Sequence, residues 1–226
     1  FKIPEGFLWR KGLYPHTIRT DQDDNVWFTV TFSNRLMKFD TRAETFTDIG
    51  LPHGGFLRWM SDTLMGVVLK IIQWFPEKNL HLALSHHKWL NGGHAAFNWP
   101  YGIDVNPVDN GVWYAKLLGN RIGVVNRETL EVTEYETPHA GPRRMRFGPD
   151  GILWIPSFDE GKLMRFSPKP TQFESIDLPV LSPGEYEMPY ALAVHQKTGD
   201  VWIAANNTDR VLRYLTAEQR FIAYPM

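Results

Sequence analysis

The sequence contains no cysteine, which excludes disulfide bonds and thiolate metal ligands, and both the cytoplasm and the periplasm suit such a chain. Charge of one sign is also scarce: the formal net charge is -1, and no cluster of basic residues stands out. Because this pattern does not attract a phosphate backbone, we expect no nucleic-acid partner.

Long apolar runs are missing as well. The most apolar stretch, residues 64–75, contains Lys70 and Gln73 and is shorter than the roughly 18 to 20 residues that cross a bilayer, so we expect no membrane span. What is present is a large stock of core-forming residues. Of the 226 residues 43% are apolar and 14% are aromatic, and 22% are charged, which is typical of one soluble domain covering residues 1–226.

Four segments of the chain share one internal pattern. Each segment opens with a proline and reaches a tryptophan 12 or 13 residues later. The four pairs are Pro15 and Trp27, Pro100 and Trp113, Pro142 and Trp154, and Pro189 and Trp202. Seven residues after each tryptophan stands a turn residue followed by a basic and an aliphatic residue, as in Asn34-Arg35-Leu36. A repeat of about 43 residues with this register predicts stacked copies of one small unit.

Each unit reads as four short strands, because apolar and β-branched runs alternate with turn signals such as Asn110-Gly111 and Asp150-Gly151. Four-stranded antiparallel units of this length are propeller blades, so the predicted fold is an all-β propeller. The recurring tryptophans are expected to fill the gaps between neighbouring blades. The predicted units are 15–52, 53–99, 100–138, 142–179 and 189–225.

The unit 53–99 departs from the pattern, since it lacks the tryptophan and turn landmarks. Its apolar residues follow a helical spacing that predicts a helix over about 62–75, with Ser61 or Asp62 as N-cap and Pro76 after its end. This helix either replaces part of a blade or caps the ring. Four histidines follow it, and they suggest either a metal site or polar loop packing: His81, His86, His87 and His94.

The sequence is compatible with two numbers of blades. The span from Pro4 to Pro225 corresponds to five units, so the chain forms either a ring of five or part of a larger propeller. Open edge strands are prone to aggregation, which favours closure or further partner sequence.

The unit that starts at Pro100 resembles the virginiamycin B lyase family of streptogramin-inactivating propellers. The resemblance is carried by Pro100-Tyr101-Gly102-Ile103, Val112-Trp113-Tyr114, Gly119-Asn120-Arg121-Ile122-Gly123 and Thr133-Glu134-Tyr135. It implies a seven-bladed ring and a carbon-oxygen lyase that opens a cyclic depsipeptide by elimination at its ester linkage. It also implies assistance by a magnesium ion.

The same resemblance implies site residues at the mouth of the central channel. The family places a histidine directly after a blade-opening proline, and His16 matches it as the candidate catalytic residue. Tyr101, Arg143 and Tyr190 occupy the corresponding positions of the other units, so with His16 they are the candidate ligand-binding residues. The family's glutamate a few residues beyond the tryptophan is absent. In its place stand Val30 and Thr31, Lys116 and Leu117, Ser157 and Phe158, and Ala205 and Asn206.

Three functions remain open at this point. The first is a lyase-like propeller that binds a small cyclic or ester-containing molecule, with His16 as a base. The second is a non-catalytic propeller that senses a ligand or binds a protein, in which His16 only donates or accepts hydrogen bonds at the mouth. The third is a calcium-dependent lactonase, for which Asn206 is the one in-phase oxygen ligand. No metal ligand is assigned, and the oligomeric state stays open.

Overall fold

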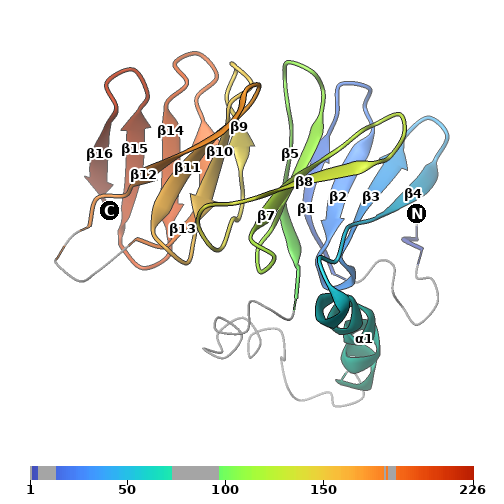
Figure 1. Cartoon of the computed structure of the whole chain (residues 1–226). Coiled ribbons are helices and arrows are strands. Elements are labelled where there is room, and N and C mark those ends of the chain that lie inside the picture. The colour runs from blue at the N-terminus through green and yellow to red at the C-terminus, as the bar shows by residue number, and fades with distance from the viewer. Residues whose placement is uncertain (1, 5–13, 73–96, 181, 183–186) are drawn as a thin grey trace.

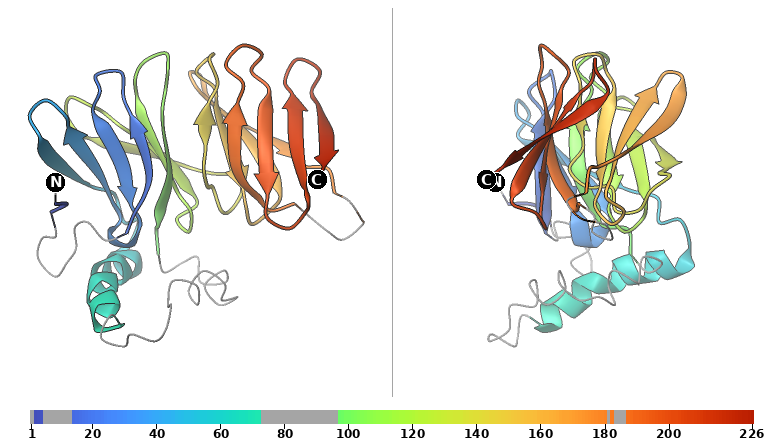
Figure 2. Two further views of the ribbon diagram at one scale, coloured as in Figure 1. Left: turned by 180° about the vertical axis from the view of Figure 1, so that it is seen from behind. Right: turned by 90° about the vertical axis from the view of Figure 1, so that its left-hand side faces the viewer.

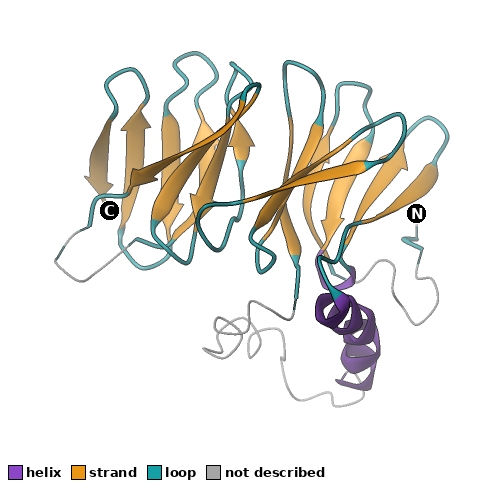
Figure 3. Ribbon diagram, in the orientation of Figure 1, coloured by secondary structure: helices purple, strands orange, loops and turns teal. Residues whose placement is uncertain are grey.

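The computed structural model describes residues 2–4, 14–72, 97–180, 182 and 187–226. These residues form four four-stranded antiparallel sheets that stand side by side in an open arc (Figure 1). Outside the sheets lie one α-helix and a short 3-10 helix, as Figure 3 shows by colour. The prediction of four-stranded antiparallel blades is therefore confirmed. Within the described residues, no helix is both long enough and apolar enough to traverse a membrane.

Blades 1 and 2 are formed by residues on either side of the helix. Blade 1 contains β1 (Pro15–Thr20), β2 (Val26–Val30), β3 (Arg35–Asp40) and β4 (Thr45–Gly50), with the 3-10 helix η2 (Thr31–Ser33) after β2. Blade 2 contains β5 (Pro100–Val105), β6 (Val112–Lys116), β7 (Arg121–Val125) and β8 (Val132–Glu136). The helix α1 (Phe56–Ile72) lies between them in sequence.

Blades 3 and 4 follow without an insertion. Blade 3 contains β9 (Arg146–Phe147), β10 (Leu153–Ser157), β11 (Lys162–Pro168) and β12 (Thr171–Asp177). Blade 4 contains β13 (Pro189–Val194), β14 (Val201–Ala205), β15 (Arg210–Leu215) and β16 (Arg220–Pro225). In every blade the strands pair in chain order, so each blade is a meander.

The repeated turn residues explain this regular folding. Asn34, Asn120 and Gly161, seven residues after their tryptophans, have φ values of 50°, 50° and 63°. This left-handed conformation is one that asparagine and glycine tolerate, and it reverses the chain between the second and third strands. The first strands, β1, β5, β9 and β13, pack against one another in succession and so form the inner edge of the arc.

Apolar clusters fill the spaces between neighbouring blades. Trp27, Trp113 and Trp154 are 0%, 4% and 4% exposed, and each packs in a cluster with residues of the next blade. Their predicted role is confirmed. Trp202 is only partly buried and stacks on Tyr224, with ring centroids 5.4 Å apart. It belongs to the last blade of the arc, beyond which the described residues contain no further sheet.

Blades 1 and 2 are direct neighbours in space. Strand β5 packs against β1 and β2, although 49 residues separate Gly50 from Pro100, and residues 53–72 and 97–99 form no strand between these blades. Helix α1 lies outside the sheets and contacts η2 at the lower end of blade 1 (Figures 1 and 2). The closed ring of five units is therefore wrong for the described residues. They form an arc of four blades, with the chain ends far apart at its two sides.

The helix begins earlier than its apolar spacing indicates. Gly54 and Gly55, with φ of 70° and 148°, turn the chain into α1 at Phe56, and the Trp59 amide donates to the Gly55 carbonyl at 3.0 Å. Asp62 is consequently inside the helix rather than its N-cap, and its carboxylate anchors α1 to the propeller. The predicted end near residue 75 lies outside the described residues, as do His81, His86, His87 and His94.

Candidate functional site

The inner strands of three blades are irregular at the same place. In β1, β5 and β13 the pairing register shifts just after the opening proline, between Pro15 and Ile18, Pro100 and Gly102, and Pro189 and Ala191. Such a bulge leaves a residue out of the ladder and re-aims its side chain. The residues in these bulges include His16, Tyr101 and Tyr190, which are three of the four predicted site residues.

Blade 3 presents its two arginines in a related way. Its inner strand is regular only over Arg146–Phe147, and before that strand Pro142 and Arg144 make isolated bridges, Pro142 to Ser157 and Arg144 to Ala191 of blade 4. The Arg143 amide donates to the Pro156 carbonyl at 3.1 Å. This irregular stretch therefore places consecutive arginine side chains beside the bulged residues of blades 2 and 4.

Six side chains from the four blades meet at the inner edge of the arc, at the end where the inner strands begin. We call them the mouth cluster. They are His16, Tyr101, Arg143, Arg144, Phe158 and Tyr190. The ring centroids of His16 and Tyr101 are 3.8 Å apart, and the hydroxyls of Tyr101 and Tyr190 are 2.6 Å apart. The four residues predicted from the sequence thus lie in one continuous set of contacts.

Aromatic rings surround the guanidinium of Arg143. Its Cζ lies 3.4 Å from the ring centroid of Phe158, 4.7 Å from that of Tyr190 and 5.5 Å from that of Tyr101. The Cζ of Arg144 lies 5.0 Å from the Tyr190 centroid and 6.0 Å from the Tyr101 centroid. Cation–π attraction of this kind is worth about 0.5–2 kcal/mol per contact, increasing with desolvation. The rings therefore hold the arginines in place without neutralising them.

Burial shapes the protonation of this cluster. It lowers the pKa of Arg143, with the nearby charge of Arg144 acting in the same direction and Tyr101, Tyr190 and Asp159 opposing it. Burial also raises the pKa of Tyr101, as does its hydrogen bond with Tyr190. The Tyr101 phenol is therefore protonated at neutral pH, and the cluster presents hydrogen-bond donors and positive charge.

The His16 imidazole is held by its neighbour. Its Nδ1 lies 2.9 Å from the Thr17 hydroxyl, and the Thr17 amide donates to the Thr29 hydroxyl at 3.1 Å. Both histidine and threonine sit in the bulge of β1. A partly buried imidazole held in this way by a neighbouring hydroxyl can transfer a proton or take part in hydrogen bonds.

The positions at which the family would carry a glutamate have other duties here. The Thr31 hydroxyl donates to the Pro100 carbonyl at 2.9 Å, and the Ser157 hydroxyl donates to the Ala140 carbonyl at 2.7 Å. Lys116 is fully buried and pairs with Glu134 at 2.5 Å, while burial lowers the pKa of Lys116. These side chains stabilise the blades.

A magnesium ion does not fit the mouth cluster. Mg²⁺ prefers carboxylate and other hard oxygen ligands, whereas this cluster offers two guanidinium groups, two phenols, a phenyl ring and an imidazole. Among the residues that the structure describes, no three His, Asp or Glu side chains gather closely enough to hold a metal ion. Arg144 and Phe158 are not among the site residues predicted from the sequence. Their signals were the doubled arginine after Pro142 and an aromatic side chain four residues after Trp154.

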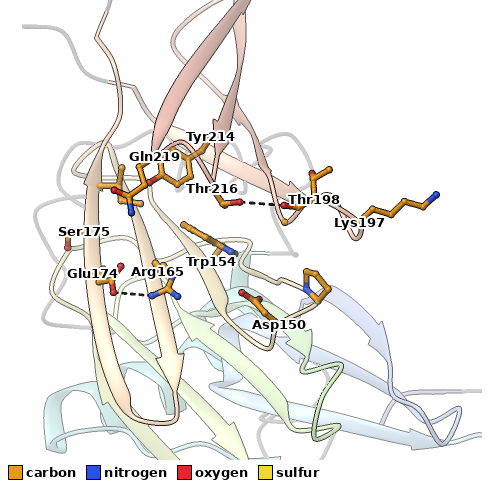
Figure 4. Close-up of a pocket in the computed structure, with 13 residues that line it drawn as sticks. Asp150, Trp154, Arg165, Glu174, Ser175, Lys197, Thr198, Tyr214, Thr216 and Gln219 are labelled. Carbon is orange, nitrogen blue, oxygen red and sulfur yellow. Dashed lines mark hydrogen bonds and ion pairs between the residues drawn. The ribbon is translucent and has the colours of Figure 1, made fainter.

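Two cavities lie at the opposite end of the blades. One, of about 680 Å³, lies between blades 3 and 4, and its walls include Trp154, Tyr214 and the hydrogen-bonded Arg165 and Glu174 (Figure 4). The other, of about 380 Å³, lies beside Asp104, which accepts from Arg19 of blade 1 at 2.9 Å and from an amide of blade 3 at 2.8 Å. Glu174 in one wall and Asp104 in the other are each paired with an arginine, whereas Arg143 and Arg144 of the mouth cluster form no ion pair with any described residue.

Comparisons with known proteins identify the fold. Solved structures of a streptogramin B lyase and of virginiamycin B lyase from Staphylococcus aureus match 94% of the chain, with TM-scores of 0.66 and 0.65 and sequence identities of 18% and 19%. Hydrazine synthase from Kuenenia stuttgartiensis also matches, at a TM-score of 0.62 and 10% identity over 92% of the chain and 47% of its own. No protein-family model and no curated protein matches the sequence.

The chain therefore has a propeller fold similar to that of streptogramin lyases. It spans about half the length of the two lyase structures, 54% and 55%. Identities this low, together with an enzyme as different as hydrazine synthase among the matches, establish the fold and leave function to the residues of the site.

Proposed function

We propose that this chain belongs to a streptogramin lyase-like propeller that binds a small cyclic or ester-containing molecule at the mouth cluster. One observation carries the proposal: His16, Tyr101, Arg143 and Tyr190 come from four different blades and form one continuous set of contacts. They occupy equivalent positions of the repeat, directly after the blade-opening prolines. Ligand sites in propellers and barrels are commonly formed at such an opening, where several elements converge.

The donors of the cluster suit an ester. In an elimination at an ester, a base removes a proton from the carbon next to a carbonyl, a carbon–carbon double bond forms, and the alkyl C–O bond breaks to release a carboxylate. His16 is the base in this proposal, because a neutral imidazole accepts a proton near pH 7. In this proposal the Tyr101 phenol accepts from the Tyr190 hydroxyl and donates a hydrogen bond to a carbonyl oxygen of the ligand, and the arginines receive the departing carboxylate.

A second candidate is a non-catalytic ligand sensor at the same site. It is favoured by the residues that replace the family's glutamate, since Thr31, Lys116 and Ser157 are engaged within the blades and supply no carboxylate base. A calcium-dependent lactonase is supported least. The side chain of Asn206 is exposed, and the described residues lack a cluster of acidic ligands.

Turnover and binding separate the two candidates. Purified protein would be incubated with a streptogramin B and magnesium, and linearisation of the substrate followed by mass spectrometry. The lyase predicts turnover that disappears in His16→Ala and survives in His195→Ala, a control at an exposed histidine in the turn after β13. The sensor predicts no turnover but calorimetric binding of a small molecule that Tyr190→Ala abolishes. Binding that is insensitive to both His16→Ala and Tyr190→Ala would contradict the mouth cluster as the site.

A further inference from the structure

Most arginines of this chain are paired with carboxylates. Eight of them lie within 4 Å of an Asp or Glu side chain: Arg19, Arg35, Arg121, Arg127, Arg165, Arg210, Arg213 and Arg220. Arg42, Arg143, Arg144 and Arg146 form no ion pair within 4 Å with any residue that the structure describes, although Asp159 attracts Arg143 electrostatically. Of these four, Arg143 and Arg144 are the two with an enclosed Nε–H group that has no acceptor. These two are also adjacent in sequence, so their like charges repel each other at short range.

Their surroundings make this arrangement costly. Both side chains are partly buried, and the Nε–H group of each is enclosed without any hydrogen-bond acceptor. A buried donor that lacks a partner costs about 1–3 kcal/mol, and more for a charged group. The rings of Tyr101, Tyr190 and Phe158 attract the cations but supply no negative charge. An anion bound here would satisfy both arginines at once.

We infer that Arg143 and Arg144 form a carboxylate-binding site within the mouth cluster, and that the ligand carries this carboxylate on an apolar, aromatic or acyl body. This inference rests on the proposed function and names the chemical class of its ligand. A guanidinium fork matches the two oxygens of a carboxylate in a bidentate pair, and two adjacent forks add their charges. Elimination at an ester would also release a product of this class, because it leaves a carboxylate on the product.

The aromatic walls decide between an organic carboxylate and an inorganic anion. Three rings line the arginines, those of Tyr101, Phe158 and Tyr190. The His16 ring lies against Tyr101, and a free phosphate would gain nothing from these apolar surfaces. An aromatic or acyl group beside the carboxylate would stack on them and gain about 0.5–1.5 kcal/mol per aromatic pair beyond burial. The ligand is therefore an organic acid whose apolar part contributes to affinity.

A matched pair of probes tests this inference by calorimetry. N-Acetyl-phenylalanine carries a carboxylate, and N-acetyl-phenylalanine amide has the same shape without the charge. We expect the acid to bind at least tenfold more tightly than the amide. Arg143→Gln and Arg144→Gln should each weaken the acid at least tenfold and leave the amide unchanged. Arg165→Gln is the control, because that arginine is paired with Glu174 at the far cavity.

The possible failures are distinct. Equal binding of acid and amide, both lost in Tyr190→Ala, would overturn the carboxylate site while leaving the mouth as the binding site. If inorganic phosphate bound as tightly as the acid, the inference that the ligand is an organic acid would be overturned. No binding of the acid at millimolar concentration would also overturn the inference, whereas the proposed function is judged separately with the streptogramin. Arg143→Lys guards against misfolding: it keeps the charge but not the fork, so intermediate affinity with an unchanged melting temperature supports the inference.

Discussion

Two arginine environments in neighbouring blades show what distinguishes a site from a structural contact. In blade 4, Arg210 is 7% exposed and its guanidinium is paired with the 1% exposed Glu187 and with the Pro179 carbonyl. In blade 3, Arg143 is enclosed by aromatic rings and forms no ion pair within the described part of the chain, although Asp159 attracts it electrostatically. The same side chain is fully satisfied where it joins strands and unsatisfied where the blades converge. We take the second arrangement as the mark of a binding site.

The largest expected effect comes from breaking the satisfied pair. Glu187→Ala removes the carboxylate that pairs with Arg210 and that accepts from the Thr208 hydroxyl at 2.7 Å, leaving a buried cation alone. Removing one partner of a buried ion pair typically costs about 3–5 kcal/mol, and we expect a loss of this size in urea unfolding. Glu174→Ala, at an exposed pair, should cost less than about 1 kcal/mol. Equal losses would show that burial does not distinguish the pairs.

The next effect concerns the contact that positions Arg143. A Cβ on Gly102 would lie 2.0 Å from the Arg143 carbonyl oxygen, so Gly102→Ala forces the inner strands of blades 2 and 3 apart. We expect a loss of about 2–3 kcal/mol from overpacking, with weaker binding of the acid probe. In Gly50→Ala the added Cβ meets only Arg35 side-chain atoms at 3.6 Å or more, and stability should stay within about 1 kcal/mol. If Gly102→Ala changed neither the free energy of unfolding nor the binding of the acid probe, the close approach of these strands would be contradicted.

A buried carboxylate contrasts with the Arg143 guanidinium, because hydrogen-bond donors surround the carboxylate. Asp21 is 6% exposed and accepts from the Trp27 indole at 2.8 Å and from the Asn25 amide at 2.9 Å. Burial raises its pKa, but these bonds outweigh burial and lower it overall. Because the folded pKa is depressed, the stabilisation is present above the unfolded pKa of about 3.9 and is lost as pH falls through the folded value.

This carboxylate therefore predicts a pH-dependent mutant effect. Asp21→Asn should destabilise the chain by about 1–3 kcal/mol at pH 7, and the difference from the unmodified chain should shrink on acidification below about pH 4. Unfolding followed by tryptophan fluorescence at several pH values measures this. Asp24→Asn, at an exposed turn position, serves as the control. A difference that stays constant down to pH 2 would exclude ionisation of Asp21 as the cause.

The smallest effect on stability is expected at Arg143 itself. Arg143→Gln removes an unpaired cation and its repulsion from Arg144, while it also loses the contact with Phe158 at 3.4 Å. These contributions oppose each other, so the free energy of unfolding should change by less than about 1 kcal/mol even though acid binding falls. A loss as large as that of Glu187→Ala would show that Arg143 is a structural residue and would remove the contrast between the two blades.

The repeat made much of this molecule predictable. Turn residues such as Asn34 and Asn120 need a left-handed conformation, and buried tryptophans such as Trp27 need a neighbouring sheet, so their spacing alone indicates the blades. The in-phase prolines also indicated which residues meet at the mouth, because equivalent positions of stacked units share one end of the axis. Whether His16, Tyr101, Arg143 and Tyr190 bind a ligand stays a prediction.

Other features depend on contacts that spacing does not encode. The start of α1 is set by Gly54 and Gly55 rather than by the apolar stripe. Trp202 shares its sequence pattern with the buried tryptophans, but its exposure depends on the absence of a neighbouring sheet among the described residues. In the sequence, Arg144 does not differ from other basic residues. Only the three-dimensional structure shows that it forms no ion pair with a described carboxylate. Long-range neighbours decide all three features.

The central claim is that the mouth cluster binds an organic carboxylate between blades that converge on one axis. A crystal structure of the chain soaked with N-acetyl-phenylalanine tests it most directly. The account predicts the carboxylate within hydrogen-bond distance of Arg143 or Arg144, with the phenyl ring against Tyr101 or Tyr190. A ligand bound only in the cavity beside Trp154, or arginines that point away from the axis and pair with carboxylates of the protein, would contradict it.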